Sequence, residues 1–108
     1  MSQTNAIILR FREDEAQRFE ELFEAEVLPM WERFKKEGKF LAASLTPVEG
    51  GSERKEGARD YILHVEVPGM EQHEEFDSSA AFKAFLAKAT PMQPEEPKVW
   101  FGTTRFQV

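Results

Sequence analysis

The stretch IILRFREDEAQRFEELFEAEVLPMWERF, residues 7–34, changes its hydrophobic period once. In its first part, apolar side chains at positions 7, 9 and 11 alternate with a mixed set, which predicts a strand with one strongly apolar face. Beyond Asp14 the apolar residues recur every three or four positions, as on one side of an amphipathic helix. These residues are Ala16, Phe19, Leu22, Phe23, Val27, Met30, Trp31 and Phe34. The stretch therefore predicts a strand followed by a long helix.

Particular residues mark the ends and the middle of this predicted helix. Asp14 followed by Gln17 is compatible with a capping box at its start. Gly38 is suited to a C-terminal cap, so the helix is expected to end near Glu37. Pro29 lies inside the helix, where proline removes a backbone donor and clashes with the preceding turn. We expect a kink there or a break into two helices.

The next segments predict a β-hairpin. Residues 40–48 alternate small and larger apolar side chains and predict a second strand. Residues 59–67 predict a third strand, because apolar residues beginning at Tyr61 alternate with a more polar set that includes His64. The segment 49–58 between them is rich in glycine and charge and is expected to form the tip of the hairpin.

The C-terminal part predicts one more helix and one more strand. Pro68 and Gly69 end the third strand, and an acidic loop is expected to lead to Asp77. Asp77 is a suitable N-cap for a short amphipathic helix over 81–89. After a connection that contains three prolines, residues 98–107 predict the last strand.

The order strand, helix, strand, strand, helix, strand is that of a ferredoxin-like α+β sandwich, in which two helices pack on one face of a four-stranded antiparallel sheet. A length of 108 residues predicts one domain over 1–108 with one core. The second face of the sheet would also be apolar, which is unusual for a face open to water. It would carry Ile8, Ala42, Ile62 and either Trp100 with Phe106 or Val99 with Phe101. We expect a second copy of the chain to cover this face.

In element order, length, a long kinked first helix and an aromatic last strand, the chain from Ile7 to Val108 resembles the dimeric α/β barrel superfamily. This superfamily includes antibiotic-biosynthesis monooxygenases, stress-responsive barrel proteins and small decyclising or isomerising enzymes. The resemblance implies a homodimer whose two sheets close face to face. ACT-type regulatory modules share the element order and are the alternative.

The resemblance also implies a site between the helices and the sheet, where members of the superfamily often hold an aromatic substrate. Met30, Trp31 and Tyr61 are expected to face this space, and the kink at Pro29 would open the helix beside the first two. The alternative is that these residues belong to the core, because an aromatic and methionine stripe at helical spacing usually does.

A second candidate site lies on the mixed face of the predicted sheet. There His64 is a candidate catalytic proton acceptor, and Arg10 is a cation that would stabilise a developing enolate or phenolate. Glu66 and Trp100 would complete the pocket as substrate-binding residues. In the structural alternative, His64 hydrogen-bonds to Glu66 or a neighbouring strand, and Arg10 and Glu66 form an ion pair.

The sequence thus favours a homodimeric barrel protein of one of two kinds. One is a cofactor-independent monooxygenase-like or isomerase-like enzyme acting on a small aromatic or cyclic substrate. The other is a noncatalytic module that binds a small ligand or serves a stress-related role. No metal or cofactor is expected, because His73 is a single histidine in an acidic loop and lacks the paired spacing of metal sites.

Composition narrows the partners. With 20 acidic and 14 basic side chains the surface is expected to repel phosphate backbones, which argues against nucleic acid. No stretch approaches the length of about 20 apolar residues that spans a bilayer, and the first residues carry no pattern of an export signal. The chain has no cysteine, which fits a reducing compartment. We therefore expect a cytoplasmic protein.

Overall fold

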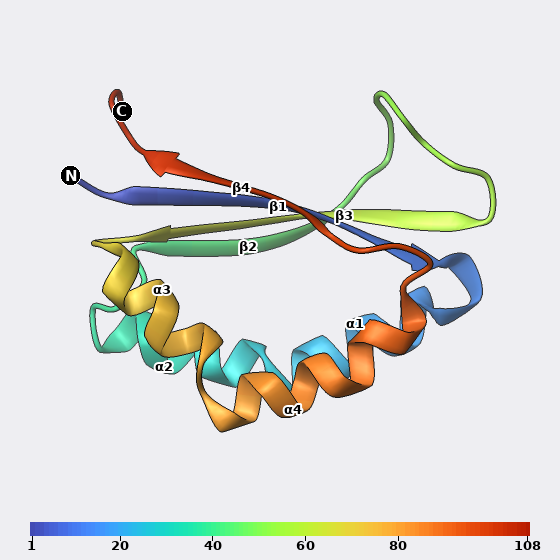
Figure 1. Ribbon diagram of the computed structural model, residues 1–108, viewed down its shortest axis with the longest axis horizontal. Coiled ribbons are helices and arrows are strands. Elements are labelled where there is room, and N and C mark those ends of the chain that lie inside the picture. Colours follow the sequence, from blue (N-terminus) through green and yellow to red (C-terminus); the bar gives the residue numbers. More distant parts are fainter.

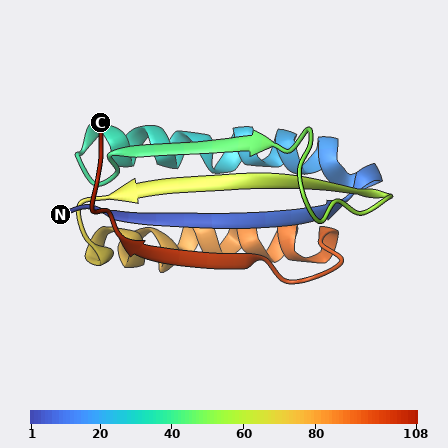
Figure 2. The same ribbon diagram turned by 90° about the horizontal axis from the view of Figure 1, so that it is seen from above.

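The computed structural model describes residues 1–108 and consists of a sheet layer over a helix layer (Figure 1). All helices lie on the same face of the sheet, and the opposite face has no helix over it (Figures 1 and 2). The elements in chain order are β1 (Gln3–Arg12), the 3-10 helix η1 (Glu13–Glu15), α1 (Ala16–Glu26), α2 (Leu28–Lys36), β2 (Ala42–Pro47), β3 (Ala58–Val67), α3 (Met70–Asp77), α4 (Ala80–Ala89), the 3-10 helix η2 (Thr90–Met92) and β4 (Lys98–Thr103).

The sheet has the strand order β2-β3-β1-β4, and each neighbouring pair is antiparallel. This is the predicted ferredoxin-like α+β arrangement. In the register of the central pair, Arg10 lies opposite Asp60 and Ala6 lies opposite His64. The register decides which polar side chains meet on the face without helices, which we call the free face.

The first predicted helix is broken in two, as expected from Pro29. Helix α1 ends at Glu26, and Pro29 occupies the first turn of α2, where a missing N–H costs no helical hydrogen bond. Gly38 follows the end of α2 with a φ of +76°, a left-handed conformation that suits a glycine cap. The predicted capping box was wrong: no side chain caps η1 or α1, and Gln17 donates instead to Glu21.

The segment after β3 differs most from the prediction. Residues 70–77 form helix α3 and not an acidic loop. Asp77 is the last residue of that helix, and the N-cap of α4 is Ser79, whose Oγ accepts a hydrogen bond from the Phe82 N–H. The three glutamates of the segment are exposed, while Phe76 is buried against the core, so burial of one aromatic side chain anchors a mostly polar helix.

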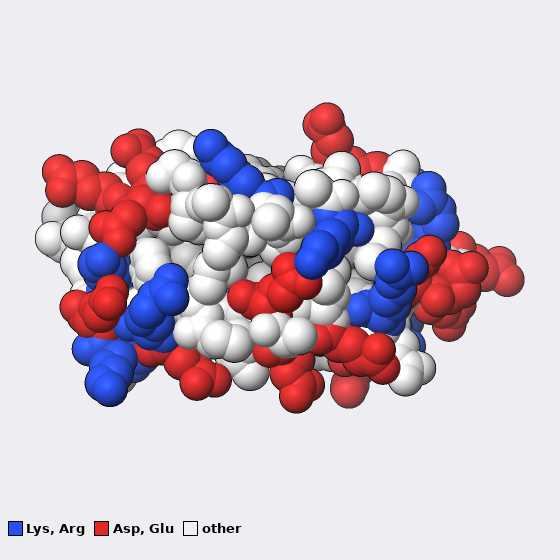
Figure 3. Space-filling view, turned by 90° about the horizontal axis from the view of Figure 1, so that it is seen from below, with Lys and Arg blue, Asp and Glu red and all other residues white.

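The core lies between the two layers and is dominated by phenylalanine. The Phe11 and Phe19 rings stack with centroids 3.8 Å apart, and Tyr61 packs edge-on against both. Aromatic pairs of this kind contribute about 0.5–1.5 kcal/mol each beyond the burial of their area. The outer side of the helix layer carries many acidic and basic side chains, with a band of uncharged residues between them (Figure 3). None of the helices combines the length and the hydropathy that a membrane span requires.

The last predicted strand is shorter than expected. Strand β4 ends at Thr103, and residues 104–108 turn across the end of the sheet over its free face (Figure 2). The Thr104 N–H donates to the Ser2 carbonyl at 2.9 Å, and Gln107 Nε2 donates to Glu66 at 2.8 Å. The tail is therefore held by the carboxylate of Glu66, which it buries.

Candidate functional site

A cavity of about 300 Å³ lies between the helices and the sheet, and we call it the interlayer cavity. Sixteen of its twenty lining residues are hydrophobic, and aromatic side chains from α1, α2 and α4 form much of the wall. Val99 of β4 lines the cavity and is 54% exposed, so the cavity reaches solvent at the β4 edge of the sheet. A mostly apolar hollow of this size is typical of sites for small organic ligands.

Three residues with polar side chains line the interlayer cavity, and two of them are paired. His73 and Asp77 lie one turn apart on α3, and Nε2 of His73 is 3.0 Å from Oδ2 of Asp77. Burial is the main cause that raises the pKa of Asp77, and the nearby His73 opposes it. When Nε2 donates its proton to Asp77, Nδ1 of His73 carries the lone pair that accepts a proton. The pair has the form of a base held by a carboxylate.

Gln93 is the third of these residues. It follows η2 in the connection to β4, and its Oε1 is buried without a hydrogen-bond partner in the protein. Asn5 presents a related feature on β1: it is 1% exposed, and neither atom of its amide has a partner. Asn5 lies opposite Val65 in the sheet, and Val65 lines the interlayer cavity. Asn5 and Gln93 are thus two buried amides with unpaired atoms, of which only Gln93 lines the interlayer cavity.

Of the three residues predicted for this space, one lines the cavity. Trp31 is in the wall, with its ring edge-on to Phe23 at 4.9 Å. Met30 is buried in the core and does not line the cavity. Tyr61 is fully buried and donates its hydroxyl to Glu20, and burial is the main cause that raises its pKa, followed by the hydrogen bond to Glu20.

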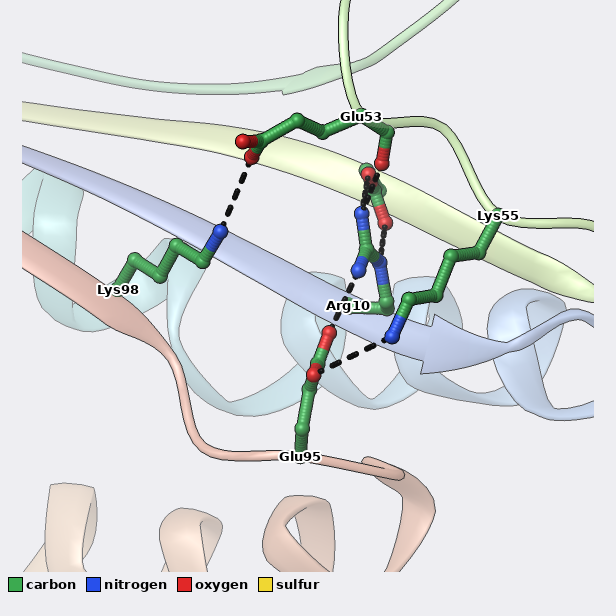
Figure 4. Close-up of polar contacts among 6 residues, drawn as sticks. Arg10, Glu53, Lys55, Glu95 and Lys98 are labelled. Carbon is green, nitrogen blue, oxygen red and sulfur yellow. Dashed lines mark hydrogen bonds and ion pairs between the residues drawn. The ribbon is translucent and has the colours of Figure 1, made fainter.

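On the free face, Arg10 is fully engaged by acceptors (Figure 4). Its Nε and Nη2 reach the two carboxylate oxygens of Asp60 at 2.7 and 2.8 Å, Nη1 reaches Glu95 at 2.6 Å, and Nη2 also reaches the Glu53 carbonyl. The hydrogen bond that Arg10 donates to Asp60 is the largest cause that raises the pKa of Arg10, and in return Arg10 lowers the pKa of Asp60. The predicted ion pair between Arg10 and Glu66 was wrong.

The register explains why the residues predicted for the free-face site do not meet. His64 is four positions beyond Asp60 on β3, and Glu66 is six beyond it. At about 3.3 Å per residue, His64 lies about 13 Å and Glu66 about 20 Å along the strand from the level of Arg10. Glu66 bonds instead to Gln107 and Ser2. His64 and Glu66 thus lie too far from Arg10 to form one site with it.

A second hollow, of about 230 Å³, lies beside Arg10 on the free face. Trp100 and Ile62 line it, but His64 and Glu66 do not. The sequence did not predict the polar residues of the interlayer cavity, which are His73, Asp77 and Gln93. For His73 and Asp77 a signal existed in their spacing of four residues, whereas Gln93 in a proline-rich connection gave none. No three histidine, aspartate or glutamate side chains are grouped so as to hold a metal ion.

The chain matches no protein-family model and no curated protein. Among solved structures, a candidate antibiotic biosynthesis monooxygenase from Caulobacter crescentus is similar over 97% of this chain and 91% of its own, with a TM-score of 0.74 and 20% identity. SnoaB, a cofactor-independent oxygenase from Streptomyces nogalater, is similar over 99% and 96%, with a TM-score of 0.69 and 13% identity. A dimeric protein of ferredoxin-like fold from Bacteroides fragilis is similar over 95% of this chain and 96% of its own, with a TM-score of 0.69 and 9% identity. The predicted resemblance is confirmed at the level of the fold.

Proposed function

We propose that the protein is an enzyme that removes a proton from a small aromatic or cyclic substrate in the interlayer cavity, in the manner of a cofactor-independent oxygenase or an isomerase. The observation that carries this proposal is the make-up of the cavity wall, which is apolar except for His73, Asp77 and Gln93. Apolar walls select a ring system, and a few placed polar groups orient it.

In the proposed chemistry His73 is the base and Asp77 is the residue that positions it. The 3.0 Å contact directs Nε2 toward Asp77, which leaves Nδ1 to take a proton from an enolisable carbon or a phenol. The resulting anion is electron-rich. In an isomerase it is protonated again at another carbon. In an oxygenase it reacts with O₂, and conversion of a CH₂ group to C=O by one O₂ releases one water, so no external reductant is needed.

The solved structures support the oxygenase alternative, because SnoaB is described as a cofactor-independent oxygenase. A noncatalytic module that binds no ligand would have the space between the helices and the sheet filled by side chains. The cavity of about 300 Å³ beside Trp31 counts against this alternative. A ligand-binding module without chemistry would keep the cavity but need no base in its wall.

We also propose that a second copy of the chain covers the free face. Ile62 on the central strand β3 is 42% exposed there and Trp100 on the edge strand β4 is 58% exposed, so two large apolar side chains of this face are open to solvent. The similarity to a protein described as dimeric supports the same arrangement. The homodimer would bury these side chains and leave the interlayer cavity of each copy open to solvent at the β4 edge.

Proton exchange tests the proposed chemistry without knowledge of the natural substrate. The probe is 2-tetralone, whose C1 protons are both benzylic and next to a carbonyl. In D₂O we expect the protein to accelerate loss of the C1 proton signal, and His73→Asn to lower the catalysed rate about 100-fold. His64→Asn tests the competing site: if it abolishes exchange while His73→Asn does not, the base is on the free face.

Two further readouts separate the functions. Consumption of O₂ with 2-tetralone distinguishes an oxygenase from an isomerase. Binding of 2-tetralone with no exchange above background, in the wild-type protein, would replace the enzyme by the ligand-binding module.

A further inference from the structure

Gln93 presents a buried acceptor that the protein itself does not use. Its Oε1 is buried, no donor of the protein is within hydrogen-bonding distance, and the residue lines the interlayer cavity. A buried acceptor without a donor is unfavourable relative to a paired one. A ligand that supplies the donor recovers this free energy on binding.

The lining of the interlayer cavity extends along helix α4, and its polar groups come from segments before and after that helix. Helix α4 contributes one face to the wall, from Phe82 to Ala89, which corresponds to about 10 Å of helix. Asp77 precedes the start of α4, and Gln93 follows its end beyond η2, in the connection that rises to β4 (Figure 1). The His73–Asp77 pair on α3 and the acceptor of Gln93 are thus separated by an apolar wall.

We propose that Gln93 is a specificity-determining residue that receives a hydroxyl or N–H donor at the far end of an elongated aromatic ligand, opposite His73. The inference rests on the proposed function for the location of the ligand, but it does not depend on proton transfer at His73. The ligand class is therefore an apolar ring system with a hydrogen-bond donor at the end remote from the reacting carbon.

The preference for a donor follows from the asymmetry of buried hydrogen bonds. A hydroxyl pairs with Oε1, whereas a methoxy group of similar shape buries a second acceptor against the first. Removal of the acceptor by Gln93→Leu abolishes the discrimination and also removes an unpaired buried atom. The substitution is expected to leave the stability unchanged or to raise it, so that a loss of affinity cannot be attributed to unfolding.

The test compares 4-phenylphenol with 4-methoxybiphenyl as ligands. Trp31 in the cavity wall reports binding by fluorescence quenching in a Trp100→Phe background, since the chain has only two tryptophans. We expect the phenol to bind about 3- to 10-fold more tightly than the ether. Gln93→Leu should remove this ratio and Gln93→Glu, which keeps an acceptor, should retain it. His73→Asn should leave it unchanged.

Each other outcome overturns the proposal. If the ratio persists in Gln93→Leu, the donor is recognised elsewhere, and if it is lost in His73→Asn, the phenol lies at the opposite end. If neither compound binds up to its solubility limit, the cavity does not take an elongated aromatic ligand. If the protein still exchanges the C1 protons of 2-tetralone in any of these cases, the proposed function stands and only the subsite at Gln93 is rejected.

Discussion

Arg10 and Glu95 connect the free face of the sheet to the wall of the interlayer cavity. Nη1 of Arg10 is 2.6 Å from Oε1 of Glu95, and Glu95 lies midway between Gln93 and Pro97, which both line the cavity. Arg10 also holds Asp60 and the carbonyl of Glu53 in the hairpin loop. The buried guanidinium of Arg10 therefore holds two loops, the hairpin loop at Glu53 and the connection to β4 at Glu95.

Removal of this guanidinium should be costly. In Arg10→Met, the carboxylate of Asp60 loses its partner in a site where both side chains are about one-tenth exposed. We expect a loss of about 3 kcal/mol in the free energy of unfolding, measured with urea. Lys98→Gln is the matched control, because its ion pair with Glu53 is solvent-exposed and should contribute less than about 1 kcal/mol. Equal effects of the two substitutions would contradict the assignment.

The weaker substitution Glu95→Gln should separate the positioning of the cavity wall from stability. Arg10 keeps its bidentate contact with Asp60, so unfolding should change by less than about 1 kcal/mol. The segment that carries Gln93 loses its charged contacts with Arg10 and Lys55 and should become more mobile. We expect the preference for 4-phenylphenol over 4-methoxybiphenyl to fall while the urea midpoint stays nearly constant. An unchanged preference would show that the segment needs no such anchor.

Asp60 and Asp77 should influence stability with opposite signs as pH changes. Arg10 lowers the pKa of Asp60 in the folded protein, so its stabilising contribution is present above the unfolded pKa and is lost as pH falls through the folded value. Burial raises the pKa of Asp77, so its ionised form is destabilising at neutral pH, and this cost disappears in acid. At pH 7 Asp60→Asn should destabilise and Asp77→Asn should stabilise, and both differences should shrink by about pH 3. Thermal unfolding across this range checks the signs.

Asn5 offers a test of stability against function in the core. Both atoms of its amide are buried and unpaired, so Asn5→Leu replaces two unsatisfied groups by an apolar side chain of similar size. We expect an increase of about 1 kcal/mol or more in the free energy of unfolding. Asn5→Ala is the control, because it also removes the amide but leaves a void and should gain less. A Leu variant less stable than wild type would mean that the amide is paired in solution.

Self-association can be tested by a charge in the middle of the free face. Ile62→Lys places a cation where two apolar sheets would meet, and we expect it to convert a dimer to a monomer in light scattering. Glu24→Gln, on the exposed side of α1, also raises the net charge by one and should leave the mass unchanged. A wild-type protein that is already a monomer at micromolar concentration would contradict the proposed dimer.

The sequence predicted the order of the strands and of the helices other than α3, because each of these elements has a clear hydrophobic period of its own. It could not predict which charges meet, since the partner of Arg10 depends on the register between β1 and β3, two strands that are separated in the sequence by α1, α2 and β2. The pattern indicated the correct face for Arg10 and the wrong partner.

The failure at α3 has a different cause. The segment 70–77 is mostly polar, and its helical signal consists of a few residues that contact the core or the cavity, chiefly His73 and Phe76. Surrounded by acidic residues, His73 reads as part of a solvated loop, and only the packing of the helix against the core places it in the cavity wall. The missed helix therefore contained the best candidate base.

The path of residues 104–108 across the sheet brings the C-terminus close to the N-terminus. Thr104 is bonded to Ser2, so both ends of the chain lie at the same margin of the free face. An affinity tag or fluorescent label attached at either terminus would stand beside the surface through which two copies are proposed to meet. Measurements of mass should therefore use protein from which the tag has been cleaved, and a label for dimer assays is better placed on the outer side of α1.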